Sequence, residues 1–246
     1  MTEQLKVVVL AAGKGTRLHT NDSDAPKVMR EANGKPLLWY VLDALSFIDK
    51  KNIILVVGYK KESVQSHFKD YKYVVQSEQK GTGHAVMSAK GQLVDHTGAL
   101  LVCYGDMPAI KGDVYQQLLR THIEQGNDCT ILTGESTLQI SFGRILRDEN
   151  GDFLHVVEEN DCTQQQLEIT ELNTGVYVFD TPKLLRALNE LKNDNSQGEY
   201  YVTDVPAIMR SHAAKIGIYK RDLGDDIIGV NTLEHLEMVE RILDRR

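Results

Sequence analysis

The chain has 246 residues, of which 41% are hydrophobic and 26% are charged, and its formal net charge is −7. This length can bury one substantial core, and no apolar run approaches the roughly 18 residues of a membrane span. The negative charge argues against a nucleic-acid backbone as the main partner, because such proteins usually carry a basic face. The first four residues lead straight into an apolar segment without a signal-peptide pattern, so we expect a cytoplasmic protein with no membrane or nucleic-acid partner.

The first half of the chain alternates short apolar runs with segments of helical periodicity. Strands are predicted over residues 5–10, 53–57, 73–75 and 99–104. Helices are predicted over residues 36–48, about 62–68 and about 84–93. Such alternation is typical of a parallel sheet with crossover helices. Cys103 lies in the last of these strands and should be buried, and three widely spaced cysteines predict neither disulfides nor a zinc site.

The second half of the chain has a different pattern. Helices are predicted over residues 113–125, 182–192, 202–212 and 232–246. Strands are predicted over residues 129–133, 173–179 and 215–219. Residues 143–147 and 153–158 flank an Asn150-Gly151 pair, which is typical of a hairpin turn.

We therefore expect an α/β fold with a doubly wound, mostly parallel but mixed sheet. The chain should form one domain over residues 1–246. Within it we expect a nucleotide lobe over about 1–110, a substrate lobe over about 111–231, and a closing helix over 232–246.

A glycine-rich loop follows the first predicted strand. It reads Leu10-Ala11-Ala12-Gly13-Lys14-Gly15-Thr16-Arg17-Leu18, and Pro26-Lys27 comes shortly afterwards. The glycines would let backbone N–H groups approach phosphate oxygens, while Arg17 and Lys27 would supply positive charge. A Walker A loop is excluded by the spacing, and Leu18 stands where the dinucleotide fingerprint needs a third glycine or alanine. The loop predicts a triphosphate site; the alternative is a tight turn alone.

Asp106 comes directly after the strand predicted over residues 99–104. In open α/β sheets, ligands bind at the carboxyl ends of the strands, so an aspartate at this place is a candidate ligand. A structural alternative is that it caps the helix that follows.

Five further motifs follow in chain order, at residues 76–85, 104–106, 173–175, 197–204 and 229–231. Together with the loop, they resemble the sugar-nucleotide pyrophosphorylases, a family of nucleotidyltransferases. Within that family, the chain is most similar to the uridylyltransferase domain of the bacterial bifunctional N-acetylglucosamine-1-phosphate uridylyltransferases, from residue 5 to about residue 240. The resemblance implies a Rossmann-like nucleotidyltransferase fold with a hairpin-bearing sugar-binding lobe.

The resemblance also implies roles on the nucleotide side. The implied nucleotide-binding residues are Leu10, Ala11, Ala12, Gly13, Gln76, Gly81, Thr82, Tyr104 and Gly105. Gln76 would read the uracil edge, because an amide offers a donor and an acceptor; otherwise it is a surface glutamine at a strand end. Arg17 and Lys27 are the implied catalytic residues. Arg17 would hold the leaving pyrophosphate, and Lys27 would lie beside the α-phosphate and the sugar phosphate.

On the metal and sugar side, the resemblance implies Asp106 and Asn231 as ligands of Mg²⁺, an ion that prefers a few protein oxygens completed by waters and phosphates. The implied sugar-binding residues are Gly143, Glu158, Asn173, Tyr201 and Thr203. Without the resemblance, Glu158 would be read as an exposed hairpin charge.

The implied reaction converts N-acetylglucosamine 1-phosphate and UTP into UDP-N-acetylglucosamine and pyrophosphate. No protein nucleophile is needed, because the attacking phosphate is already ionised, and catalysis falls to orientation and charge neutralisation. No hexapeptide repeat follows, so acetyl transfer is not predicted.

Two features depart from the family pattern, a longer loop over residues 18–25 and Phe142 where a tyrosine is common. Two alternatives stay open. One is a pyrophosphorylase for another sugar 1-phosphate or nucleotide, such as glucose 1-phosphate, CTP or dTTP. The other is a catalytically silent nucleotide-sugar sensor. A homo-oligomer is also left open.

Overall fold

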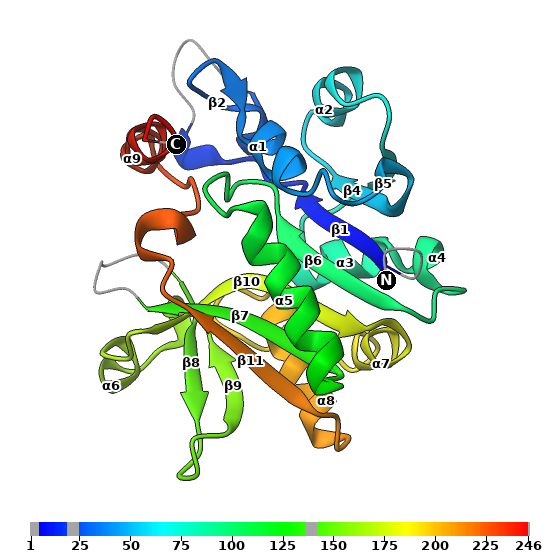
Figure 1. Ribbon diagram of the computed structural model, residues 1–246, viewed down its shortest axis with the longest axis vertical. Helices are drawn as coiled ribbons and strands as arrows, with labels where there is room; N and C mark the ends of the chain where they lie inside the picture. The colour runs from blue at the N-terminus through cyan, green and yellow to red at the C-terminus, as the bar shows by residue number, and fades with distance from the viewer. Residues whose placement is uncertain (1–4, 19–24, 136–141, 246) are drawn as a thin grey trace.

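The computed structural model describes residues 5–18, 25–135 and 142–245. Within these residues, nine strands form one sheet, in the order β11-β7-β10-β6-β1-β4-β5, with β8 and β9 attached through β10 (Figure 1). The strands β1 (Leu5–Ala11), β4 (Ile53–Val57), β5 (Lys72–Val75) and β6 (Ala99–Tyr104) are mutually parallel. Short, almost wholly apolar runs such as β4 are what a sheet covered on both faces requires.

The other half of the sheet is mixed. The long strand β10 (Glu171–Asp180) runs antiparallel to both β6 and β7 (Cys129–Glu135), and β11 (Ile216–Arg221) runs parallel to β7. The pairing of β10 with β7 shifts register between Asn173 and Tyr177. Bulges of this kind redirect side chains beside functional sites. The expected mixed, doubly wound architecture is confirmed.

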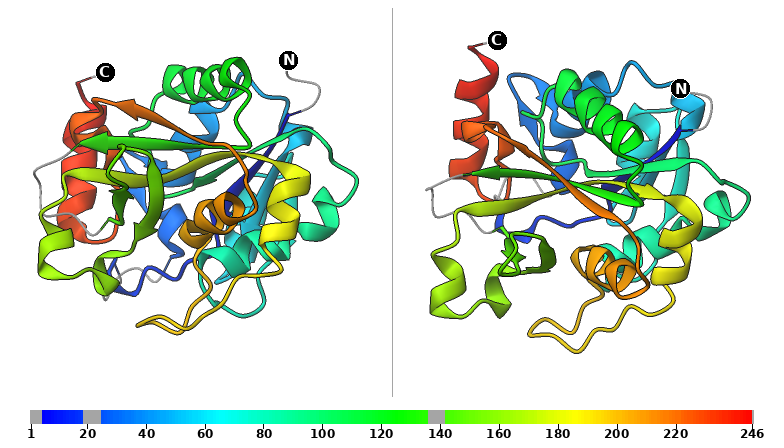
Figure 2. Two further views of the ribbon diagram at one scale, coloured as in Figure 1. Left: turned by 90° about the horizontal axis from the view of Figure 1, so that it is seen from below. Right: turned by 60° about the horizontal axis from the view of Figure 1, so that its bottom comes forward.

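Helices cover both faces of the sheet because successive side chains of a strand point to opposite sides. Val7 and Val9 of β1 face a core built with α1 (Leu37–Ala44), α2 (Lys61–His67) and α5 (Gly112–Gln125). Val8 and Leu10 face a second core built with α3 (Thr82–Ser88), α4 (Lys90–Leu93), α7 (Thr181–Ala187) and α8 (Val205–Ser211). Figure 2 shows α5 on one side of the sheet, with α7 and α8 on the other.

Two hairpins interrupt this pattern. The strands β8 (Arg144–Arg147) and β9 (Phe153–Val157) pair antiparallel around Gly151, which has φ +82°, as the Asn-Gly pair predicts. A second hairpin, β2 (Glu31–Ala32) with β3 (Lys35–Pro36), was missed. Its turn is also an Asn-Gly pair, with positive φ at both Asn33 and Gly34.

The helices differ from the prediction mainly at their ends. The helix predicted over 36–48 is α1 alone, because Pro36 belongs to β3 and the chain turns after Ala44. Leu45 and Ile48 remain buried from that turn, so apolar spacing overestimates the helix. The segment predicted over 84–93 divides into α3 and α4. Short 3₁₀ turns lie at Thr16–Leu18, Lys27–Met29, Lys50–Asn52, Glu159–Asp161, Val202–Asp204 and Gly224–Ile227.

A C-terminal helix and a short helix of one turn complete the fold. The closing helix α9 (Leu233–Leu243) packs against the β2–β3 hairpin, where Asn33 Nδ2 donates to Glu240 O at 3.2 Å. The helix α6 (Gln164–Leu167) was not predicted, although Thr163 and Gln166 form a capping box that signals its start. Within the described residues, every helix is too short or too polar to traverse a lipid bilayer.

Candidate active site

The site lies at the carboxyl ends of β1 and β6. These strands pair parallel up to Leu10 and Tyr104, so Ala12, Gly13, Gly105 and Asp106 come to the same edge of the sheet. Gly105 N donates to Leu10 O at 2.9 Å. A Cβ on Gly105 would lie 3.1 Å from both Leu38 and Val28, so a side chain there would press on the core behind the site.

A first cavity, which we call the loop cavity, has a volume of ≈ 300 Å³. Of the predicted site residues, it is lined by Leu10, Ala12, Gly13, Lys27, Gln76, Gly81, Thr82, Tyr104 and Asp106. Ala11 does not line it, because its side chain is packed in the core on the other face of β1. Gly105 is not among the residues that line this cavity either. Gln79 was not predicted as a site residue, but it lines the cavity and donates from Nε2 to Ala12 O at 2.8 Å.

Gln76 is buried, with 5% of its surface exposed, so the alternative of a surface glutamine is wrong. Its Nε2 lies 3.0 Å from Gly81 O and 3.2 Å from His84 Nδ1. His84 comes from the first turn of α3, and Gly81 precedes that helix with φ +101°. A Cβ on Gly81 would lie 2.5 Å from Tyr200 O, so only glycine fits this turn.

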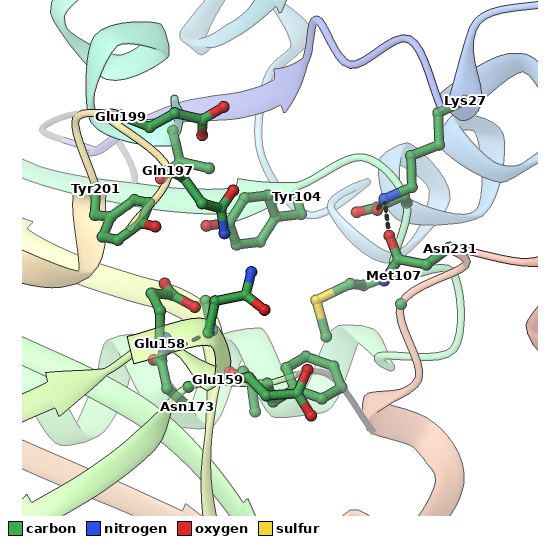
Figure 3. A pocket seen from close by; sticks show the side chains of 18 of the residues that line it. Lys27, Tyr104, Met107, Glu158, Glu159, Asn173, Gln197, Glu199, Tyr201 and Asn231 are labelled. Atoms are coloured by element: carbon green, nitrogen blue, oxygen red, sulfur yellow. Dashed lines mark hydrogen bonds and ion pairs between the residues drawn. The ribbon is translucent and has the colours of Figure 1, made fainter. Parts of the chain in front are cut away.

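A second cavity, which we call the hairpin cavity, has a volume of ≈ 370 Å³ and opens beside the end of the β8–β9 hairpin (Figure 3). It is lined by six predicted residues that do not line the loop cavity: Arg17, Gly143, Glu158, Asn173, Tyr201 and Asn231. The bulge in β10 carries Asn173 to this wall. Thr203 does not line the cavity. It is buried behind it and donates to Glu158 Oε1 at 2.8 Å.

The two cavities share part of their walls. Lys27, Thr82, Tyr104, Asp106 and Glu199 line both. Glu199 was not predicted as a site residue, although it lies within the motif 197–204. The shared wall is the geometric centre of the site, because a group bound there contacts the contents of both cavities.

Lys27 connects the two predicted metal ligands on this shared wall. Its ammonium forms an ion pair with Asp106 and donates to Asn231 Oδ1 at 2.6 Å (Figure 3). Only 17% of the Lys27 side chain and 13% of the Asp106 side chain are exposed, so solvent screens this pair less than a surface pair. Asp106 is not a helix cap, since α5 begins at Gly112 and Lys111 is its N-cap.

The hairpin cavity contains carboxylates whose ionisation is disfavoured. Burial raises the pKa of Glu158, and nearby Asp204, Asp161 and Glu159 raise it further, while the hydrogen bond from Thr203 opposes the shift. Glu158 is therefore not an exposed hairpin charge. Burial also raises the pKa of Glu199. Burial, with acidic neighbours, raises the pKa of Tyr201 to about 12, so its hydroxyl is a hydrogen-bond donor at neutral pH.

Tyr104 is fixed against the bulge of β10. Gly175 has φ +75°, and a Cβ there would lie 1.9 Å from the Tyr104 ring. The ring thus occupies the space that any larger residue at position 175 would need. This contact links the strand that ends at the loop cavity with the strand that carries Asn173 into the hairpin cavity.

The two departures from the family pattern are Phe142 and the loop over residues 18–25. Phe142 lines the hairpin cavity, and its carbonyl accepts a hydrogen bond from Arg144. The loop over residues 18–25 falls mostly in 19–24, outside the described residues. Met107 also lines the hairpin cavity and was missed, since an apolar residue after a strand carries no signal of its own.

Comparison with known proteins identifies the family. The family pattern of the MobA-like NTP transferase domain matches residues 7–212. The chain is 42% identical over 98% of its length to the bifunctional protein GlmU of Lactobacillus delbrueckii subsp. bulgaricus, and 41% identical over 97% to that of Streptococcus mutans serotype c. It spans about half, 52%, of the length of each of these curated relatives.

The fold is also that of a solved structure of UDP-glucose pyrophosphorylase complexed with UDP-glucose. The TM-score is 0.76, with 19% sequence identity and 98% of each chain covered. This likeness supports the fold, and the family match over residues 7–212 supports the activity class. The chain therefore belongs to the family of MobA-like NTP transferase domains and is a nucleotidyltransferase.

Proposed function

We propose that the chain transfers a uridylyl group from UTP to N-acetylglucosamine 1-phosphate and releases pyrophosphate. The observation that carries the proposal is the shared wall of the two cavities, where Lys27 meets Asp106. A transfer between two substrates needs two sites that meet where the new bond forms. A protein that only binds a finished sugar nucleotide has less need of a charged pair such as Lys27 and Asp106 at that place.

UTP is assigned to the loop cavity. Its wall includes Leu10, Ala12 and Gly13, whose small or apolar side chains and backbone allow a flat base and ribose to approach closely. Gln76 supplies an amide at the inner end of the cavity. The identity of 41 to 42% with two GlmU proteins supports the choice of nucleotide.

The sugar phosphate is assigned to the hairpin cavity. Asn173 and Tyr201 offer an amide and a hydroxyl, and Glu158 offers carboxylate oxygens, which together suit the hydroxyl and amide groups of an N-acetylated sugar. Thr203 is proposed to act through Glu158 by fixing its carboxylate. In this way the hairpin cavity would orient the sugar 1-phosphate toward Lys27.

In the proposed reaction, a phosphate oxygen of the sugar 1-phosphate attacks the α-phosphorus of UTP in line. A new P–O bond forms, the bond from the α-phosphorus to the bridging oxygen breaks, and pyrophosphate leaves with the bonding electrons. Lys27, on the shared wall, would stabilise the negative charge that concentrates at the α-phosphate. Arg17, at the loop end of the hairpin cavity, would hold the leaving pyrophosphate.

Asp106 and Asn231 fit a magnesium ion. Their side-chain oxygens converge on one cationic group, the Lys27 ammonium, and carboxylate and amide oxygens are donors that Mg²⁺ prefers. Mg²⁺ takes its other ligands from water and phosphates, so two protein oxygens are enough for such a site. When bound, Mg²⁺ would neutralise phosphate charge at this wall.

The experiment is pyrophosphate release measured with UTP, CTP and dTTP, each paired with N-acetylglucosamine 1-phosphate or glucose 1-phosphate. The proposal predicts the highest kcat/KM for UTP with N-acetylglucosamine 1-phosphate. A preference for glucose 1-phosphate, CTP or dTTP would replace the substrate assignment. Tight binding of UDP-N-acetylglucosamine without turnover of any pair would instead identify a sensor.

A further inference from the structure

The side-chain amide of Gln76 has both of its hydrogens engaged by the protein. Nε2 is 3.0 Å from Gly81 O and 3.2 Å from His84 Nδ1. An amide nitrogen carries two N–H groups and accepts nothing, and a carbonyl oxygen only accepts. His84 Nδ1 must therefore accept the second hydrogen, which places the proton of a neutral His84 ring on Nε2.

This arrangement fixes which end of the amide faces the loop cavity. Turning the amide over would place Oε1 against Gly81 O, an acceptor that offers no hydrogen, and His84 could donate to Oε1 only after its proton moved from Nε2 to Nδ1. Within the described residues, the hydrogen bonds of the Gln76 side chain both use Nε2, and Gln76 lines the loop cavity. A buried amide in this state presents an acceptor and no donor to a bound base.

We propose that His84 is a positioning residue for base selection, which holds Gln76 as an acceptor and thereby favours a pyrimidine that carries a hydrogen on N3. Uracil has such a hydrogen, whereas cytosine has a lone pair on N3 that would oppose Oε1. The contact does not separate uracil from thymine, which is identical at N3. The inference deepens the proposed function and rests on its assignment of the nucleotide to the loop cavity.

His84 is half-buried in the first turn of α3 and does not line either cavity, so it acts through Gln76. Without an acceptor at position 84, one N–H of Gln76 loses its partner. Of the two contacts, only the one to Gly81 O then holds the amide, so Oε1 is less firmly placed and cytosine can gain a donor for its N3. One lost hydrogen bond at a buried site corresponds to a change of about tenfold in a binding ratio.

The test compares the Kd values of UTP and CTP by calorimetry, with Mg²⁺ present and sugar phosphate absent. His84→Phe removes the acceptor and keeps a ring, whereas His84→Asn keeps an acceptor oxygen near the place of Nδ1. His67→Phe makes the same change at the end of α2, away from both cavities, and serves as the matched control. His84→Leu replaces His84→Phe if circular dichroism shows that the latter does not fold.

The native chain, His84→Asn and His67→Phe should all prefer UTP to CTP, and His84→Phe should narrow that preference about tenfold. The ratio is independent of the fraction of folded protein, so a purely structural loss would leave it unchanged. The inference is overturned if His84→Phe leaves the ratio of the Kd values of CTP and UTP unchanged. It is also overturned if His84→Asn loses as much of the preference for UTP as His84→Phe does, or if the native chain prefers CTP.

Binding is measured without turnover, so the two proposals fail separately. A narrowed ratio in a chain that releases no pyrophosphate supports the role of His84 and contradicts the proposed reaction. If the chain releases pyrophosphate from UTP but His84→Phe leaves the ratio of the Kd values of CTP and UTP unchanged, the proposed reaction is supported and the role of His84 is contradicted. A chain that binds neither nucleotide overturns both.

Discussion

The two cavities are built in different ways, although they share a wall. The loop cavity takes most of its wall from residues 10–13 and 76–85, two segments that each follow a strand of the parallel half of the sheet. The hairpin cavity collects residues from 142–143, 158–160, 173–175, 197–201 and 229–231. Two loops that follow strands thus form most of the first cavity, whereas the second cavity is assembled from many separate segments of the chain.

The cavities also differ in chemistry. The loop cavity offers backbone, small side chains and amides, which suit a flat base. The hairpin cavity adds Glu158 and Glu159, and burial disfavours ionisation of Glu158. If each cavity serves one substrate, variants on the shared wall should affect turnover, and variants in one cavity should affect only its own substrate.

The largest effect is expected for Lys27→Ala, on the shared wall. If Lys27 stabilises charge in the transition state, kcat should fall by roughly 10²- to 10³-fold, while the Kd of UTP changes far less. Steady-state pyrophosphate release and calorimetry measure the two quantities. Lys50→Ala, which removes an exposed lysine paired with Asp70, is the control. An unchanged kcat would remove Lys27 from the mechanism.

Gly175→Ala tests the packing that joins the two cavities. It should destabilise the fold by about 2–4 kcal/mol, because the methyl group meets Tyr104 and the backbone has φ +75°. Gly151→Ala has a similar φ of +82° but open space around its Cβ, and should cost about 1 kcal/mol. Urea unfolding measures both. If both variants lost the same free energy of unfolding, Tyr104 would not occupy a fixed place beside Gly175.

Asp106→Asn tests the metal ligands. The Mg²⁺ concentration needed for half-maximal pyrophosphate release should rise at least about tenfold, because an amide replaces the one carboxylate of the pair. The change should appear with every sugar phosphate, as expected for the shared wall. Asp95→Asn alters an exposed carboxylate and should leave the Mg²⁺ concentration for half-maximal release unchanged. An unaltered Mg²⁺ dependence in Asp106→Asn would point to other ligands.

Thr203→Val tests whether the two cavities act separately, because Thr203 donates a hydrogen bond to Glu158, which lines the hairpin cavity and not the loop cavity. The KM for the sugar phosphate should rise about 3- to 10-fold, the equivalent of one hydrogen bond, while the KM for UTP stays the same. The loss of the hydrogen bond raises the pKa of Glu158 further, so the acid limb of sugar binding should move to higher pH. Thr121→Val, in α5, is the control. An equal change in both KM values would contradict separate cavities.

The smallest effect concerns Asp204, which adjoins Thr203. Burial, followed by repulsion from Asp161 and Asp194, raises the pKa of Asp204 to about 6. The native state therefore binds this proton more tightly than the unfolded chain, and the stability from protonation is lost as pH rises through about 6.

Asp204→Asn should consequently raise the Tm by about 2–4 °C at pH 8 and leave it nearly unchanged at pH 4. Thermal unfolding at the two pH values measures the difference. Kinetic constants for UTP should not change, since Asp204 lines neither cavity. A larger gain at pH 4 than at pH 8 would contradict the raised pKa.

The loop cavity was the more predictable of the two. A strand followed by Gly13 and Gly15, and Asp106 after a second strand, predict from spacing alone that these residues share one edge. Spacing does not reveal Gln79, whose contact with Ala12 depends on how the loop folds back. Spacing also does not show that the Ala11 side chain packs in the core, because that depends on which face of β1 the residue occupies.

The hairpin cavity could be predicted only through the family resemblance. Asn173 reaches the cavity because β10 has a bulge, and Asn231 meets Lys27 across 204 positions of sequence. No local pattern encodes either event. Helix ends were also poorly predicted, because residues such as Leu45 and Ile48 can be buried from a turn as well as from a helix. The subdivision near residue 110, the role of each site residue and the oligomeric state stay predictions.

The most direct test of the shared wall is a crystal structure of the chain with UTP and Mg²⁺. We expect the uracil beside Gln76 in the loop cavity, and the triphosphate beside Lys27 and Asp106 with its outer phosphates toward Arg17. A triphosphate bound elsewhere, away from Lys27 and Asp106, would show that the shared wall is not where the nucleotide reacts.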